Sequence, residues 1–241
     1  MKFVIRYNLG RRDANALFVA LTAAQTGRGP PVWLELIHIH LDESLVNRLS
    51  RAFRGTDNLL SISIDDCSIE SQHLSTLLGS IRGKSLRHFC INKIPLRPRD
   101  LVATLGLIKA HPALEALTLS NCKLGAVGMA ALFEVTQAMD KLRVINLAGN
   151  AIGDAGARIF RDALPNHRAL TSILLNHNEI GEEGGEAIVE AIRWARKDAG
   201  CKVMVFGLYG NKFSPAACQK IRQLHPHGDS FLDVDVTALV E

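Results

Sequence analysis

Four residues between positions 38 and 88, namely His38, His40, Asp65 and His88, are of types that transfer protons. Imidazole and carboxylate groups act as general acids and bases when they lie within hydrogen-bond reach of a substrate. The spacing of these four indicates only that they lie near one another. Solvated surface residues at a partner interface are therefore the favoured interpretation, and no catalytic residue is predicted.

Two short motifs bring imidazoles together, HIH at 38–40 and HPH at 225–227. Both lack a clear third ligand, so no metal site is predicted. The glycine-rich segment GNAIGDAG at 149–156 is of a kind that cradles phosphate, but the Lys-Ser/Thr of a P-loop does not follow it. The sequence thus predicts no cofactor and gives no evidence of a small-molecule substrate.

Five cysteines, at positions 67, 90, 122, 201 and 218, are widely spaced and form no CxxC pair. Their number and spacing disfavour a disulfide framework and predict a reducing compartment, the cytoplasm or an organellar matrix. Cys90 is expected to be an ordinary surface thiol. The longest apolar run, at 16–24, is too short to span a membrane, so no membrane association is predicted.

Basic residues dominate the stretch from 82 to 99, which contains six of them and no acidic residue. A solvated face is the favoured interpretation, and the functional alternative is a docking patch for an acidic protein or for RNA phosphate. The stretch contains one phenylalanine, Phe89, and no alternation of aromatic with basic residues that would support base stacking. The candidate residues of this patch are Arg82, Lys84, Arg87, Arg97 and Arg99.

A repeat of 28 residues positions these side chains. Its pattern, L-x-x-L-x-L-x-x-[NC]-x-L, places a polar residue at Cys122, Asn150 and Asn178, which we call the ladder position. The same register extends to Cys67 and, after a gap of 33 residues, to Asn211. Ile94 occupies the ladder position in one irregular unit, and Asp42 fits loosely in the first.

Glycines follow the ladder position in three units, as in Ile152, Gly153, Gly156, Phe160. With this tail the chain resembles the leucine-rich repeat superfamily, in its ribonuclease-inhibitor-like form, over residues 34–224 and most specifically over 114–192. The resemblance implies an α/β solenoid, a right-handed β-α superhelix with parallel strands on its concave face. It also implies a single domain, with a cap or degenerate repeat at 1–33 and a further cap at 225–241.

The residue types that recur in each repeat can be explained by burial. Period-2 alternation directs Leu, Ile and Phe inward from each strand. An Asn side chain has both a donor and an acceptor, so it can satisfy buried backbone groups of neighbouring coils at the turn. Helices are expected at 128–139, 156–164 and 185–197, where apolar residues recur every three or four positions.

The predicted binding surface follows from the same alternation. Residues two and four positions before the ladder face outward on the concave wall, and the residues beside them flank it. The leading function is non-catalytic binding of another protein by this wall. The partner-contacting candidates are His38, His40, Asp65, His88, Asn92, Lys93, Asn146, Asn176, His177 and Tyr209.

Two other functions fit the sequence. One is a structural subunit of a large ribonucleoprotein assembly that uses the basic residues at 82–99, with RNA contact the weaker interpretation. The other comes from the resemblance, which includes Ran-GTPase-activating proteins: Arg11 and Arg12 precede a predicted helix and could assist phosphoryl transfer.

Overall fold

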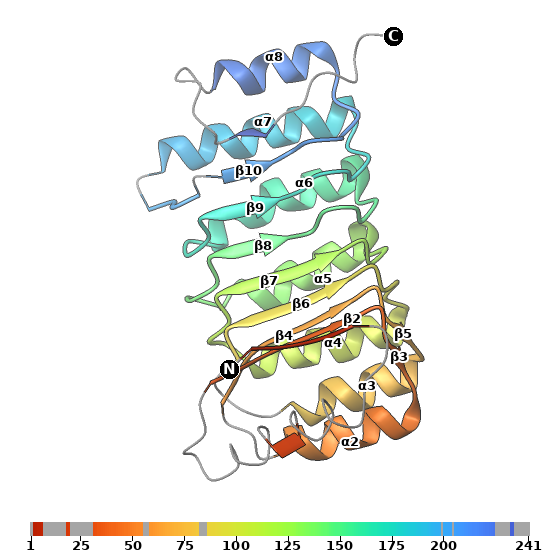
Figure 1. Cartoon of the computed structure of the whole chain (residues 1–241). Helices are drawn as coiled ribbons and strands as arrows, with labels where there is room; N and C mark the ends of the chain where they lie inside the picture. Colours follow the sequence, from red (N-terminus) through yellow and green to blue (C-terminus); the bar gives the residue numbers. More distant parts are fainter. Residues whose placement is uncertain are drawn as a thin grey trace. The chain divides into compact units, whose positions relative to one another are not determined.

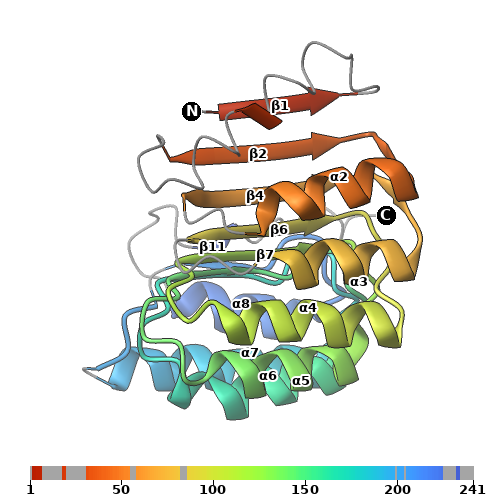
Figure 2. The ribbon, with the colours of Figure 1, turned by 90° about the horizontal axis from the view of Figure 1, so that it is seen from below.

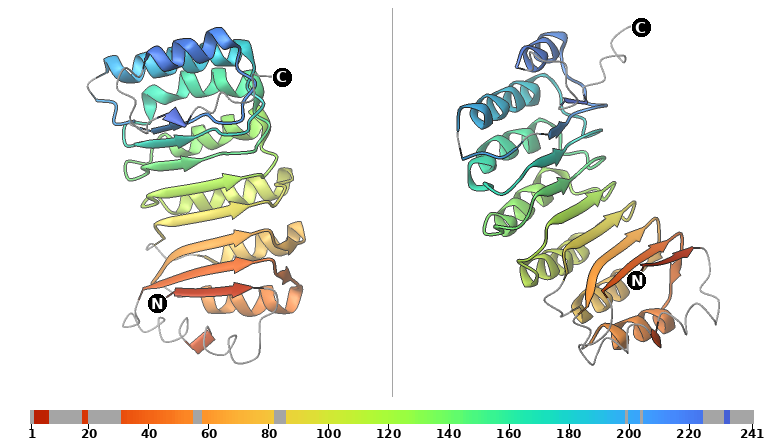
Figure 3. Two further views of the ribbon diagram at one scale, coloured as in Figure 1. Left: turned by 45° about the horizontal axis from the view of Figure 1, so that its top comes forward. Right: turned by 60° about the vertical axis from the view of Figure 1, so that its left-hand side comes forward.

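Figure 1 shows a computed structural model of the chain, which describes residues 2–6, 18–19, 31–54, 58–81, 86–198, 200–203, 205–224 and 232–233. The chain divides into two compact units, residues 1–117 and 118–241. Both units consist of the predicted strand, turn and helix repeats. Figures 2 and 3 show that in each unit the helices cover one face of the strands and leave the other uncovered.

The first unit contains a parallel sheet in the order β1-β2-β4-β6. A small second sheet pairs β3 with β5, just beyond the ends of β2 and β4. Three helices, α2, α3 and α4, alternate with the strands along the chain. The bounds are β1 Lys2–Arg6, β2 Val32–Ile37, β3 His40–Leu41, α2 Glu43–Phe53, β4 Leu59–Asp65, β5 Ser68–Ile69, α3 Ser71–Ser80, β6 His88–Asn92 and α4 Pro98–Ala110.

The second unit begins within β7 and continues the same alternation, with sheet order β7-β8-β9-β10-β11. Segments 145–150 and 173–178 lie side by side as predicted, since Ile145 pairs with Ile173. The acidic C-terminal segment contributes β11, which pairs with β10. The bounds are β7 Ala116–Ser120, α5 Gly125–Thr136, β8 Val144–Asn146, α6 Gly153–Ala163, η2 Leu164–Asn166, β9 Ser172–Leu174, α7 Glu182–Lys197, β10 Val205–Gly207, α8 Pro215–Gln223 and β11 Leu232–Asp233.

The core of the second unit lies between its strands and helices. Alternate strand residues such as Ile145 and Ile173 are completely buried there. Phe160 of α6 contacts two further rings, with centroids 6.2 Å from Phe133 of α5 and 6.3 Å from Phe206 of β10. Aromatic pairs at such separations add to the stabilisation from burial alone, so neighbouring repeats are joined through their side chains as well as their backbones.

The ladder residues satisfy buried backbone groups as predicted. Asn150 is completely buried; its Oδ1 accepts hydrogen bonds from the N–H groups of Cys122 and Leu124 at 3.0 and 3.3 Å. Its Nδ2 donates to the carbonyls of Leu119 and Leu147 at 2.6 and 2.9 Å. Asn178 and Asn211 repeat this arrangement. Each amide side chain thereby ties its own turn to the preceding repeat.

The register predicted for the first repeat is wrong by three residues. Leu36 pairs with Ile64, so the ladder position falls on the buried Ile39 and not on Asp42. Asp42 instead caps α2, because its Oδ1 accepts the N–H of Leu45 at 2.8 Å. The register was misassigned because the segment LELIHIHLD at 34–42 contains two overlapping apolar patterns. In addition, the cap residue Asp42 is polar, as a ladder residue was expected to be.

Candidate protein-binding surface

The strand residues that point away from the helices form what we call the strand face of each unit. In the first unit these residues are half-buried or exposed, and several carry charge. Lys2 pairs with Glu35 at 2.7 Å, and Asn92 Nδ2 donates to Asp65 Oδ1 at 2.7 Å. His88 is exposed at the start of β6. Lys2, Glu35, Asp65 and Asn92 are therefore surface side chains that pair with one another.

Cys90 lies in the middle of β6 on the first strand face and is half-buried. Burial raises the pKa of its thiol, and the hydrogen bond with Ser63 only partly opposes this. A thiol with a raised pKa is a poor nucleophile at neutral pH. The geometry therefore fits the ordinary thiol that the sequence indicated.

His38 and His40 do not lie on the strand face, contrary to the prediction, because of the register error. His38 follows β2 in a left-handed turn with φ 54°, and His40 belongs to the small β3–β5 sheet. His38 Nδ1 lies 3.2 Å from Asp66 Oδ2, and Lys93 Nζ lies 3.7 Å from the same oxygen. His38, Asp66 and Lys93 occupy equivalent turns, so they form a column beside the strand face.

This left-handed column is a general feature that the sequence did not reveal. The residue just before the ladder position has φ between 51° and 70° in every described repeat. In the second unit its members are Asn121, Gly149, His177 and Gly210. A Cβ on Gly149 would clash with the side chain of Asn121, and one on Gly210 would clash with His177. The two glycines thus make room for the larger side chain of the preceding repeat.

The basic residues predicted as one patch are separated by the strand. Arg87 precedes β6, where Nη1 donates to the carbonyl of Ala113 at 3.1 Å and Nε lies 3.9 Å from Glu115. Arg97 and Arg99 are exposed beyond the other end of β6, where α4 begins. The described residues do not include Arg82 and Lys84, the other two members of the predicted patch. They also do not include Arg11, Arg12 or the HPH motif at 225–227.

On strands β8, β9 and β10 the strand face of the second unit carries no charged residue, whereas Asp233 of β11 pairs with Gly207, one of the outward positions. Asn176 Oδ1 accepts the N–H of Tyr209 at 2.8 Å, and Asn146 Oδ1 accepts the N–H of Ala148 at 3.0 Å. The rings of His177 and Tyr209 meet edge to face, with centroids 4.8 Å apart and planes at 87°. Tyr209 is 38% exposed. The outward positions along β8, β9 and β10 are Val144, Asn146, Ala148, Ser172, Leu174, Asn176, Val205, Gly207 and Tyr209.

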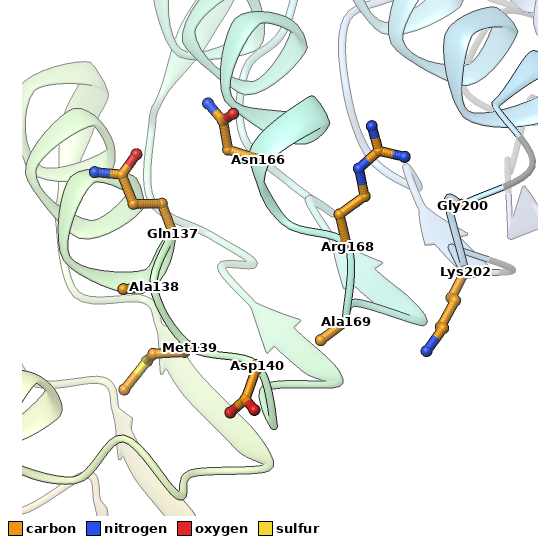
Figure 4. A pocket seen from close by; sticks show the side chains of 9 residues that line it. All are labelled: Gln137, Ala138, Met139, Asp140, Asn166, Arg168, Ala169, Gly200 and Lys202. Carbon is orange, nitrogen blue, oxygen red and sulfur yellow. The ribbon is translucent and has the colours of Figure 1, made fainter.

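A cavity of about 500 Å³ lies at the edge of the second unit where each helix leads to the next strand (Figure 4). One wall, Gly200 and Lys202, comes from the connection that follows α7 in the 33-residue repeat. Arg168 of the preceding repeat forms an ion pair with Asp198 at the start of this connection, at 2.6 Å. The cavity is bounded by loops of three successive repeats, and its lining mixes polar and apolar residues.

Two buried histidines were missed by the sequence analysis. His111 and His167 both occur eleven residues before a ladder position, after a helix, and are almost completely buried. His167 Nδ1 lies 2.9 Å from the carbonyl of Ala163, and Nε2 lies 3.0 Å from Thr136 Oγ1. Burial lowers the pKa of His167. This shared position was the available signal, and it indicates a structural role.

Within the described part of the chain, His, Cys, Asp and Glu side chains form no group of three or more that could hold a metal ion. The described helices also include none that is long and apolar enough to cross a bilayer.

Comparison with known proteins agrees with the repeat geometry. A family model described as "Leucine Rich repeat" matches residues 111–133, 140–158 and 166–189. Ribonuclease inhibitor of Sus scrofa is 22% identical over 191 residues, which are 66% of this chain and 41% of that protein. These matches support the leucine-rich repeat, ribonuclease inhibitor-like family that the sequence indicated. The fold of the chain is the predicted α/β leucine-rich repeat solenoid.

Two further similarities place this leucine-rich repeat chain among its relatives. A NACHT, LRR and PYD domains-containing protein 4C of Mus musculus is 29% identical over 54% of this chain and 14% of its own length. The solved leucine-rich repeat-containing protein LegL7 of Legionella pneumophila has a TM-score of 0.51 at 16% identity, covering 90% of this chain and 69% of that one. The chain spans less than half the length of these two curated relatives.

Proposed function

We propose that this leucine-rich repeat chain is a non-catalytic module that binds another protein on the strand face of its second unit. Proteins with such repeats generally mediate protein–protein interaction. The observation that supports the finer proposal is the absence of charged residues from the strand face along β8, β9 and β10, together with an exposed aromatic pair, Tyr209 and His177. The concave-face binding predicted from the sequence is thereby narrowed to one set of residues.

The chemistry of this face fits an interface core. Such cores are depleted in charged residues and enriched in tyrosine, and hot spots favour large aromatic anchors. Tyr209 is also held in place, because its N–H bonds Asn176 and its ring contacts His177. An anchor that is already ordered loses less conformational entropy on binding.

Site-specific photo-crosslinking tests the proposal. A benzophenone amino acid at Tyr209 should crosslink a partner in an extract of the source cells. The same probe at Val127, which is 83% exposed on α5, is the matched control on the helix face. Crosslinking at Val127 but not at Tyr209 would show that the partner binds the helices instead.

The other two functions stay predictions. Neutralising Arg97 and Arg99 should weaken RNA binding and reduce its salt dependence if these residues contact phosphate. A GTPase turnover assay with Arg11→Ala and Arg12→Ala tests the activator function, and an absence of stimulation by the unmodified chain removes it. The reducing location, proposed from the spacing of the cysteines, can be tested by localising the tagged chain.

A further inference from the structure

We propose that the partner presents an uncharged, largely apolar surface to the part of the second unit's strand face that β8, β9 and β10 form; this inference rests on the function proposed above. None of the nine outward positions along β8, β9 and β10 carries Asp, Glu, Lys or Arg, and Asp233 of β11, which pairs with Gly207, belongs to the border of this region. Charged residues make up 22% of the whole chain. They are therefore absent from the part of the surface where solvent exposure alone would favour them.

Charged residues do occur around this face, in pairs. Glu179 pairs with Lys212 at 3.5 Å beside the left-handed column, and Arg168 pairs with Asp198 at 2.6 Å at the opposite edge. A neutral centre within a charged border is the usual anatomy of a protein interface. These four border residues already have partners in this chain, so a docking surface need not supply charges opposite to theirs.

The free energy of burial determines which partner fits. A carboxylate or ammonium group pressed against Leu174 or Val205 would lose its hydration without meeting an opposite charge, which is strongly unfavourable. Nucleic acid fits poorly for the same reason, since no lysine or arginine on this face could neutralise a phosphate. Apolar side chains, accompanied by neutral hydrogen-bonding groups, can contact the same atoms without this penalty.

The strand face of the first unit provides an internal contrast. At equivalent outward positions it carries Lys2, Arg6, Glu35 and Asp65. The repeat architecture therefore tolerates charge at these positions. Neutrality in the second unit is a property of that unit's sequence and not a requirement of the fold.

A random peptide library gives a direct test. The probe is a phage-displayed library of cyclic dodecapeptides, selected on the whole immobilised chain. Clones that lose binding on Tyr209→Ala, but not on Val127→Ala, report on the strand face. We expect these clones to contain at most half the Asp, Glu, Lys and Arg of the unselected library, with affinities that change by less than about twofold between low and high salt.

An isosteric charge provides the matched variant. Asn146→Asp keeps the oxygen that accepts the N–H of Ala148 and adds one negative charge to the face. It should weaken the selected clones about tenfold or more. Gln137→Glu adds the same charge at an exposed position in the loop-edge cavity and should change binding by less than about twofold.

The outcomes separate the inference from the function it rests on. Tyr209-dependent clones that are rich in charged residues, bind more weakly in high salt, or tolerate Asn146→Asp would overturn the neutral partner and leave the docking surface intact. If no clone depends on Tyr209 and no crosslink forms there, the docking surface itself is wrong. Circular dichroism and thermal melts of each variant confirm that the fold is retained.

Discussion

Replacing Asn150 tests the account of how the repeats are held together. Asn150→Leu keeps a buried side chain of similar size but removes both the acceptor and the donor. Two buried N–H groups, those of Cys122 and Leu124, would lose their partner, and the carbonyls of Leu119 and Leu147 would each lose a donor. Each orphaned buried group costs about 1–3 kcal/mol. The two N–H groups alone therefore predict a loss of about 2–6 kcal/mol in the free energy of unfolding.

Urea denaturation measures this loss, and hydrogen exchange locates it. The amides of Cys122 and Leu124 should exchange faster in Asn150→Leu, because their acceptor has gone. Asn146→Ala is the control, since Asn146 is half-buried and its Oδ1 accepts the N–H of Ala148, two residues away. It should cost less than about 1 kcal/mol.

The result that would refute the ladder is specific. If Asn150→Leu is no more destabilising than Asn146→Ala, and the Cys122 and Leu124 amides stay protected, the side-chain amide does not stabilise the turn. The apolar core alone would then account for the stacking of the repeats in the second unit.

Three further predictions follow from burial and backbone geometry. Burial lowers the pKa of His167 in the native state, so the unfolded state takes up a proton at a higher pH than the native state does. The free energy of unfolding should therefore fall as the pH drops below about 6.5. Measured as the urea midpoint at a series of pH values, this fall should be smaller in His167→Gln. Gly149→Ala should destabilise the chain by about 1–3 kcal/mol in thermal melts, because the position has a positive φ and the added Cβ would clash with Asn121. Gly79→Ala on α3 should stabilise it by about 0.5–1 kcal/mol, because the added Cβ would have open space and alanine favours the helix. Cys90 should react with iodoacetamide more slowly in the native chain than in urea, by mass spectrometry, because burial raises its pKa.

The repeat was predictable from the sequence because burial imposes it. A ladder residue such as Asn150 must satisfy backbone groups in two coils, so few side chains serve there, and the apolar positions before it follow the pleat of the strand. The first repeat was misplaced because Ile39 is apolar and Asp42 is polar for an unrelated reason, as a helix cap. Local pattern cannot distinguish a cap from a ladder residue when both follow alternating apolar residues.

The candidate site was less predictable, because surface positions obey no comparable rule. The alternation of the strand correctly placed Asn146 and Asn176 outward. It could not show that Tyr209 contacts His177, since these residues belong to different repeats and meet only through the register of the strands. The residue types of the left-handed column vary from repeat to repeat, so no motif marked it.

The column shows how the fold separates stability from recognition. Its positive φ is set by the turn, and side chains such as Asp66 and Lys93 adopt it, so a glycine is not required by the backbone alone. Gly149 and Gly210 are instead matched to the side chains of Asn121 and His177, which lie across them. Residue choice along the column is therefore coupled between neighbouring repeats. In the second unit the ladder asparagines Asn150, Asn178 and Asn211 keep their hydrogen bonds while the column residue beside them changes from Gly149 to His177 to Gly210, so there the outer surface can vary without loss of these bonds.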